Sequence, residues 1–293
     1  MKKGWYRWAS MMLAVLCVAV LPLSLANAAD KWYYLGADEK YGKFFDPASV
    51  VATKETKTDK GMVATEIEAW TKTTYSYAGA AETIETYEIK SQLPNPAQLS
   101  YSLAQVRINP QNRTLQYVRE NFYDAQGKVV WSTAEGRVKE INSREFDEPF
   151  YAVIVDEIFR QGERARCLAE DRWISLWQES KEGFTIKVIA DTTTMRLRGD
   201  NLILWEWEEM TDSSHNVLEI KFVKKAVNLP NGTEKFVSGQ YWNSKEGWKN
   251  LEDDMDGAYR SIQETSPEYK GLERLRAFAK GYSTWVNRYS LGE

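Results

Sequence analysis

The feature that most restricts the fold of this 293-residue chain is an internal repeat. The segment Leu115–Gly127 returns in relaxed form as Lys235–Gly247. Each version is an alternating strand that ends in an aromatic pair, followed by a turn that Asp124 or Asn243 opens and a glycine closes. Asx side chains bond their own backbone and glycine tolerates positive φ, so both segments predict a hairpin turn. The pattern indicates one domain written twice.

Other residues keep the order of this repeat. The pairs are Trp32 with Trp173, Trp70 with Trp207, Tyr123 with Trp242, Gly127 with Gly247, and Ile141 with Ile262. The separation within a pair falls once along the chain and then stays level. We therefore expect the second copy to lack one long connection, near residues 92–114 of the first.

Strand and helix patterns follow one another in each copy. Two-residue alternation and β-branched residues predict strands in the first copy at residues 32–35, 43–45, 63–75, 82–90, 99–108, 115–123 and 128–133. Apolar stripes then predict a closing helix, which starts at Pro149 in the first copy and after Ser266 in the second. The expected class is α+β: two tandem domains, each an antiparallel meander closed by a C-terminal helix.

The expected domain boundaries follow from this reading. Residues 1–28 form a signal peptide, 29–160 the first domain, 161–171 a charged linker and 172–293 the second, divergent copy. The first 28 residues carry a basic head, an apolar run and small residues before Ala29, as secretory signals do. A retained membrane anchor is the rival interpretation, but Pro22 interrupts a run that is short for a span of about 20 residues. We therefore expect export to the periplasm or cell surface, without a membrane span after cleavage.

Charge argues against nucleic acid as a partner. Loss of the signal takes away three positive charges and moves the net charge from −4 to −7. A nucleic-acid surface needs a basic stripe, whereas charges here alternate in sign, as at Lys54 and Glu55.

The cysteines predict no internal disulfide. Cys17 leaves with the signal and follows Leu16 rather than a small residue, so no lipid anchor is expected. Cys167 then remains alone and is either inert or paired between chains.

Motifs of catalysis and metal binding are scarce, and we expect no enzyme, cofactor or metal. His215 is the only histidine and lies in a polar stretch that predicts a turn. Residues 252–257 resemble the start of a calcium loop, but Gln263 stands where the bidentate glutamate belongs, so an acidic turn is the other interpretation. Glycoside hydrolysis needs paired carboxylates. The candidates, Glu206 with Glu208 and Asp156 with Glu157, are ordinary among 42 acidic residues.

Aromatic density on strands is the distinctive signal. One helix cannot cover two faces of a sheet, so some aromatic side chains are expected on the surface, available to a protein or glycan partner or to a second copy. The candidate binding residues are Trp205, Trp207, Trp242 and Trp248.

Six features of the first copy occur in a characteristic order: a signal peptide, Trp32, the residues 45–50, a strand that ends at residues 70–72, the hairpin at 123–127, and a closing helix. Over about residues 31–160 this order resembles the surface-adhesin protein E-like family, and the second copy matches it weakly. The resemblance implies a small antiparallel sheet with a C-terminal helix, in the periplasm or at the cell surface. For the adhesin itself it implies binding of extracellular-matrix proteins. Members often carry a cysteine pair, which is missing here at the matching places.

Two functions stay open. The first is an adhesin-like, non-catalytic binding module with exposed aromatic residues on its sheet. The second is a periplasmic structural or envelope-maintenance protein whose paired domains bury those residues against each other. A hydrolase is a distant third and would require a deep cleft that holds two carboxylates.

Overall fold

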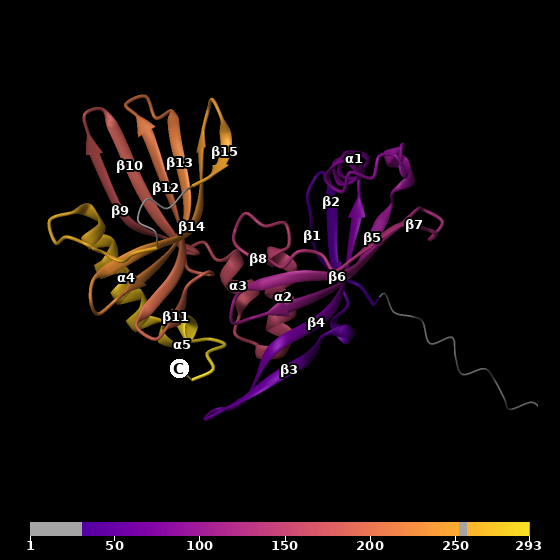
Figure 1. Ribbon diagram of the computed structural model, residues 1–293, viewed down its shortest axis with the longest axis horizontal. Coiled ribbons are helices and arrows are strands. Elements are labelled where there is room, and N and C mark those ends of the chain that lie inside the picture. Colours follow the sequence, from indigo (N-terminus) through magenta and orange to yellow (C-terminus); the bar gives the residue numbers. More distant parts are fainter. Residues whose placement is uncertain (1–30, 252–256, 293) are drawn as a thin grey trace, which may run out of the picture.

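The computed structural model describes residues 31–251 and 257–292, which form two antiparallel sheets of eight strands each (Figure 1). The expected signal peptide and five residues of the acidic run, 252–256, lie outside the described residues. The first sheet contains β1 (Tyr33–Ala37), β2 (Tyr41–Phe45), β3 (Val51–Thr58), β4 (Gly61–Tyr75), β5 (Tyr101–Asn109), β6 (Thr114–Tyr123), β7 (Val129–Ala134) and β8 (Lys139–Glu140). The second contains β9 (Trp173–Lys181), β10 (Phe184–Asp191), β11 (Arg196–Arg198), β12 (Asn201–Asp212), β13 (Val217–Asn228), β14 (Thr233–Asn243), β15 (Gly247–Asn250) and β16 (Arg260–Ser261).

The two sheets have the same strand order, which confirms the internal repeat. The first runs β1-β2-β4-β5-β6-β7, with β3 beside β4 and β8 beside β6. The second runs β9-β10-β12-β13-β14-β15, with β11 beside β12 and β16 beside β14. Each strand thus has the same neighbours as its counterpart, so the copies share one topology within a two-domain, β-rich architecture.

A matching turn follows the second strand of each copy. Ser49 Oγ donates to the carbonyl of Asp46 (2.7 Å) and accepts from the Trp70 amide (2.8 Å). In the second copy Thr194 Oγ1 donates to the carbonyl of Asp191 (2.8 Å) and accepts from the amide of Trp205 (3.0 Å), as the hydroxyl of Ser49 does from its own strand. The turn therefore fixes the alignment of the copies residue by residue.

This alignment corrects one of the predicted pairs and confirms Tyr123 with Trp242 and Ile141 with Ile262. The two glycines are offset by one position, because Gly247 faces Asn243, whereas Lys128, next to Gly127, faces Asp124. Trp70 corresponds to Trp205, two residues before the expected Trp207, because both receive the hydrogen bond of the turn. Pairing across each sheet matches Phe45–Thr71–Ala104–Glu120 with Ala190–Glu206–Val223–Gly239. Both ladders contain a register shift one residue further on, after Gln105 and after Lys224. The matches of Tyr123 with Trp242 and of Ile141 with Ile262 follow from the same register.

The long connection of the first copy lies earlier than expected. Residues 76–100 hold α1 (Tyr77–Thr86) and the short 3-10 helix η2 (Pro96–Gln98), where the second copy turns directly from β12 to β13. The predicted strand at 82–90 is therefore wrong. Ser76 Oγ accepts from the amide of Gly79 (3.2 Å) and caps a run of small residues, so a helix starts there. Local capping outweighs the β-branched pattern that follows.

Four more helices complete the fold: α2 (Glu148–Phe159), α3 (Glu163–Leu168), α4 (Pro267–Gly281) and α5 (Ser283–Val286), with the 3-10 helix η1 at Pro47–Ser49. The helix α2 packs Phe150, Tyr151 and Ile154 into the core of the first sheet, and α4 packs Leu272, Leu275 and Phe278 into that of the second. No helix in residues 31–251 and 257–292 is both long and apolar enough to span a membrane.

Candidate functional site

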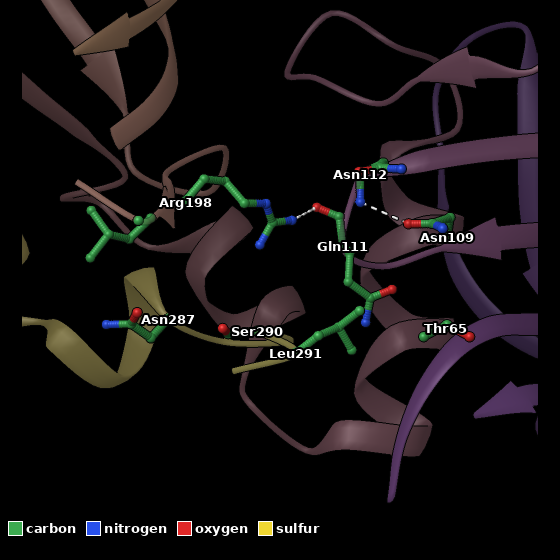
Figure 2. A pocket seen from close by; sticks show the side chains of 10 residues that line it. Thr65, Asn109, Gln111, Asn112, Arg198, Asn287, Ser290 and Leu291 are labelled. Carbon is green, nitrogen blue, oxygen red and sulfur yellow. Dashed lines mark hydrogen bonds between the residues drawn. The ribbon is translucent and has the colours of Figure 1, made fainter. Parts of the chain in front are cut away.

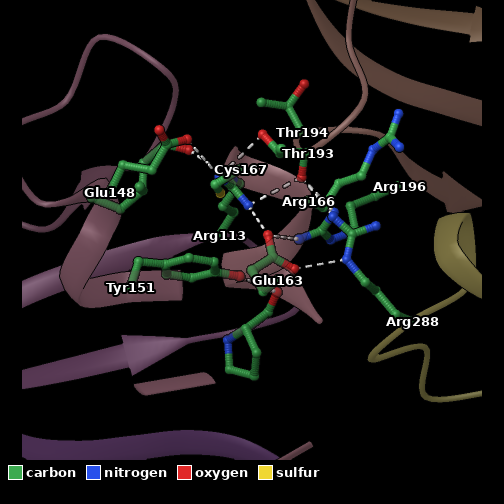
Figure 3. Close-up of polar contacts among 12 residues, drawn as sticks. Arg113, Glu148, Tyr151, Glu163, Arg166, Cys167, Thr193, Thr194, Arg196 and Arg288 are labelled. Atoms are coloured by element: carbon green, nitrogen blue, oxygen red, sulfur yellow. Dashed lines mark hydrogen bonds and ion pairs between the residues drawn. The ribbon is translucent and has the colours of Figure 1, made fainter. Parts of the chain in front are cut away.

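A buried cluster of charged side chains joins the two halves (Figure 3). Its centre is Glu163 at the start of α3, with an exposed fraction of 0%. Arg113 Nη1 from the first half contacts Glu163 Oε1, and Arg288 Nε from the end of the second donates to Oε2 at 2.9 Å. We call the whole set the interdomain ion cluster: Arg113, Glu148, Glu163, Arg172, Asp191, Arg196 and Arg288.

The second copy's turn supplies the other acceptors of this cluster. The Thr193 carbonyl accepts from Arg113 Nη1 (3.0 Å), Arg196 Nη1 (3.0 Å) and Arg288 Nη2 (2.5 Å). The corresponding residue of the first copy is Ala48, on the exposed side of its own turn. One of two equivalent turns has thus become the contact between domains.

Burial alone would lower the pKa of the Arg113 guanidinium, but Glu163 and Glu148 hold it well above its usual value, so Arg113 stays charged. The segment expected as a linker, 161–171, carries Glu163 at the centre of this cluster. The halves are therefore fixed against each other by paired charges rather than joined by a loose connection.

The candidate binding residues share one face of the second sheet. Cross-strand pairing places Trp207 opposite Phe222 and Trp242 opposite Trp248, and Trp205 lies two residues before Trp207 on the same strand. Side chains two residues apart on a strand point to the same side. The ring centroids of Trp205 and Phe222 are 4.5 Å apart, and those of Trp207 and Trp248 are 6.0 Å apart. All four tryptophans thus form one aromatic face, defined with Phe222.

Residues 137–145 of the first copy cover part of this aromatic face. Trp205 is 7% exposed, and its Nε1 donates to Glu140 Oε1 at 3.1 Å. Trp207 and Trp242 are half-buried, whereas Trp248 is 37% exposed. The guanidinium of Arg144 lies 3.5 Å from the centre of the Trp248 ring, and its Nη1 donates to Gln240 Oε1 at 2.7 Å.

Between residues 137–145 and the aromatic face lies a cavity of about 550 Å³, which we call the aromatic groove. Its lining includes Arg137, Asn142, Arg144, Trp205, Gln240 and Asn250. Burial lowers the pKa of the Arg144 guanidinium, since this side chain is withdrawn from water beside rings. The groove thus combines aromatic surface, side-chain amides and cations, a combination suited to hydroxyl, amide or carboxylate groups of a ligand.

A second interdomain cavity, of about 450 Å³, has a polar lining (Figure 2). Figure 2 shows Gln111 and Asn112 of the first half facing Arg198 of the second, with Leu291 below them. Gln111 Nε2 donates to the carbonyls of Ala64 (2.9 Å) and Tyr289 (3.1 Å), while its Oε1 is buried and has no hydrogen-bond partner in the described part of the chain. The side-chain amide of Gln111 therefore links the two halves, because it binds carbonyls of both.

The remaining candidate residues have structural positions. His215 lies exposed in the turn between β12 and β13. Asp156 accepts from the amides of Glu163 (2.7 Å) and Arg164 (2.8 Å), so it caps α3. Within residues 31–251 and 257–292, no group of three or more His, Cys, Asp or Glu side chains is arranged to hold a metal ion.

The carboxylates of Glu206 and Glu208 lie on the opposite face of β12 from the tryptophans. Glu206 is 3% exposed and pairs with Lys225 Nζ at 2.8 Å. Burial raises the pKa of Glu206, and Lys225 opposes this. Glu208 pairs with Lys221 at 3.1 Å. The charged face of this strand therefore points inward and is neutralised by lysines.

Sequence reasoning missed Arg144, Glu140 and Gln240, which complete the groove. They belong to no motif, and two come from the other copy, so only the packing of the halves reveals them. The fold and site together define a tandem two-sheet protein with an aromatic interdomain groove. No known family model matches the chain, and no curated protein is significantly similar to it.

Proposed function

We propose that this chain is a non-catalytic binding module of the cell envelope, which holds a protein or glycan partner in the aromatic groove. The observation that carries the proposal is the stacking of Arg144, which lines the cavity of about 550 Å³, on the partly exposed ring of Trp248. Exposed aromatic rings beside amides and arginine are the groups that recur at sites of recognition.

Three features support a binding role over catalysis. The carboxylate pairs that a hydrolase would need are occupied: Glu206 by Lys225, Glu208 by Lys221 and Asp156 by backbone amides. The interdomain ion cluster holds the groove in one shape, which reduces the entropy lost on binding. The ring of Trp248, on which the groove residue Arg144 stacks, is 37% exposed and can be reached by a partner.

The location and the family belong to the same proposal. We infer export to the periplasm or cell surface from the composition of residues 1–28. We further propose kinship with the surface-adhesin protein E-like family and an α+β class in which α2 and α4 close their sheets. That resemblance implies extracellular-matrix proteins as the partner, and the aromatic groove leaves a glycan as the other class.

Binding is tested with the mature chain on a printed glycan array and on immobilised laminin, fibronectin and collagen. We expect one of these surfaces to retain the protein, and Trp248→Ala to reduce that retention by about tenfold or more. Phe184→Ala is the matched control, because Phe184 is 47% exposed on the same sheet but lies on the opposite face. If both variants lost retention equally, or if Trp248→Ala lost none, the result would contradict binding in the groove.

The alternative is a periplasmic structural or envelope-maintenance protein. It is favoured by one observation: residues 137–145 already cover Trp205, so part of the aromatic face serves the contact between copies. Protease treatment of intact cells separates the two functions. Cleavage at the surface supports the adhesin-like module, and complete protection supports the structural protein.

A further inference from the structure

The first half contains another cavity, of about 220 Å³, between its sheet, α1 and the segment that leads into α2. Its walls are aromatic, and we call it the tyrosine pocket: Tyr41, Tyr75, Tyr87, Tyr117 and Phe146. The rings meet edge to face, with centroids 5.0 Å apart for Tyr41 and Phe146. The pocket is separate in composition from the aromatic groove, although Lys139 lines both.

Two buried carboxylates line this pocket, and they differ in their partners. Asp147 is 0% exposed, pairs with Lys139, and accepts from the hydroxyl of Tyr117 at 2.5 Å. Glu120 is 5% exposed, and within residues 31–251 and 257–292 it accepts only from neutral hydroxyls, those of Tyr87 and Ser102, both at 2.7 Å. Among the described residues, no lysine or arginine nitrogen lies within 4.0 Å of Glu120. A buried carboxylate without a cation is costly, so a cation bound beside Glu120 would stabilise its charged form.

The second copy shows that the repeat itself does not require this acid. The residue that corresponds to Glu120 is Gly239, where a Cβ atom would lie 2.9 Å from Val223 Cγ1. Thr73 and Ser102, which pair across the first sheet, correspond to Glu208 and Lys221, whose ion pair occupies that face in the second copy. The helix α1, which roofs the pocket, belongs to the insertion of the first copy. Both the pocket and the acid are therefore features of the first copy and not of the shared repeat.

We propose that the tyrosine pocket binds a small organic cation, an ammonium group on a short alkyl chain, which pairs with Glu120 and contacts the tyrosine rings. Ammonium groups are attracted to the faces of aromatic rings, and cages of such rings bind alkylated ammonium ions. The volume of the pocket admits a ligand of a few heavy atoms. This site is independent of the aromatic groove and of the function proposed for it.

The pKa of Glu120 is consistent with a buried carboxylate that lacks a paired cation. Burial raises the pKa of Glu120, and the hydroxyls of Ser102 and Tyr87 and the more distant charge of Lys139 only partly oppose this. A bound cation would supply the compensating charge.

Isothermal titration of the mature chain with choline and with its neutral isostere 3,3-dimethyl-1-butanol tests the proposal. We expect choline to bind and the alcohol to bind about tenfold more weakly or not at all, because only charge distinguishes the two ligands. Glu120→Gln should weaken choline binding by about tenfold or more, while Glu208→Gln, on the equivalent face of the second copy, should leave it unchanged. Thermal unfolding of each variant verifies that it is folded.

Butylamine and Nα-acetyl-lysine amide form two further arms of the titration. Preference for the lysine derivative identifies the cation as a protein side chain, and preference for choline or butylamine identifies a free amine; either supports the site. Equal affinity for choline and its isostere would overturn the proposal, and this comparison needs no variant. Unchanged choline binding by Glu120→Gln, or no binding of any amine at about 10 mM, would do the same.

Discussion

Arg288 Nε donates to Glu163 Oε2 at 2.9 Å, and both side chains are fully withdrawn from solvent although 125 residues separate them in the chain. Arg113 and Arg196 point to the same carboxylate. Glu163→Gln removes the charge that three arginines share, and breaking one side of a buried pair costs about 3–5 kcal/mol. We expect the free energy of unfolding in urea to fall by about that amount.

Lys249→Ala is the control for this variant. Lys249 pairs with Glu246 at 2.6 Å on the exposed surface, where such pairs add little. The urea midpoint of the Lys249→Ala variant should equal that of the unmodified protein. A similar loss in the two variants would contradict the central position of Glu163.

Because the same turn occurs in both copies, equivalent substitutions in the two turns should each lower the stability of the protein. Thr194→Val and Ser49→Ala each remove the hydroxyl that bonds a strand amide, that of Trp205 or Trp70, and an unsatisfied buried donor costs about 1–3 kcal/mol. Thr194→Ser keeps the hydroxyl, so its free energy of unfolding should fall less than that of Thr194→Val. Chemical denaturation measures all three, and equal stability of the serine and valine variants would refute the assignment.

Cys167 should react slowly in the folded protein. Burial first, then the nearby Glu148, raises the pKa of its thiol to about 12, so the reactive thiolate is scarce at neutral pH. A time course with Ellman's reagent should show slow labelling in buffer and rapid labelling in guanidinium chloride. Rapid labelling of the native protein, or a disulfide-linked dimer on a non-reducing gel, would favour pairing between chains.

Glu120 predicts a pH-dependent stability. Its pKa in the folded protein is raised above the ordinary value of 4.5 by burial, with Asp147 adding to the shift and the hydroxyls of Ser102 and Tyr87 and the charge of Lys139 opposing it. Between 4.5 and the raised pKa the unfolded chain releases a proton that the folded chain keeps, so stability falls as pH rises through that window. Glu120→Gln lacks this titration. The difference in unfolding free energy between the two proteins should therefore move in favour of the variant as pH rises above 4.5, and a constant difference would contradict it.

The repeat and the principal strands were accessible to sequence reasoning because their signals are local. The hairpin glycines Gly127 and Gly247 both have positive φ, as the Asx-to-glycine turns predicted. The helix α2 begins one residue before the expected Pro149. By contrast, β3 was missed because its side chains, such as Lys54 and Lys57, are exposed at the edge of the sheet and show no apolar alternation.

The site was accessible only in part. A face that carries Trp205 and Trp207 follows from strand periodicity, whereas the place of Trp242 on it depends on the pairing register. Arg144, which stacks on Trp248, comes from a connection in the first copy and is placed by tertiary packing alone. The interdomain ion cluster was equally hidden, since Arg113 and Arg288 give no sequence signal that distinguishes them from surface arginines.

Tyr289 follows α5, at the end of the second copy, but packs in the core of the first with Phe159, at a ring separation of 4.4 Å. Its hydroxyl donates to Glu163 Oε2 at 3.0 Å. The half that is synthesised first therefore cannot reach its final packing until Tyr289 has left the ribosome.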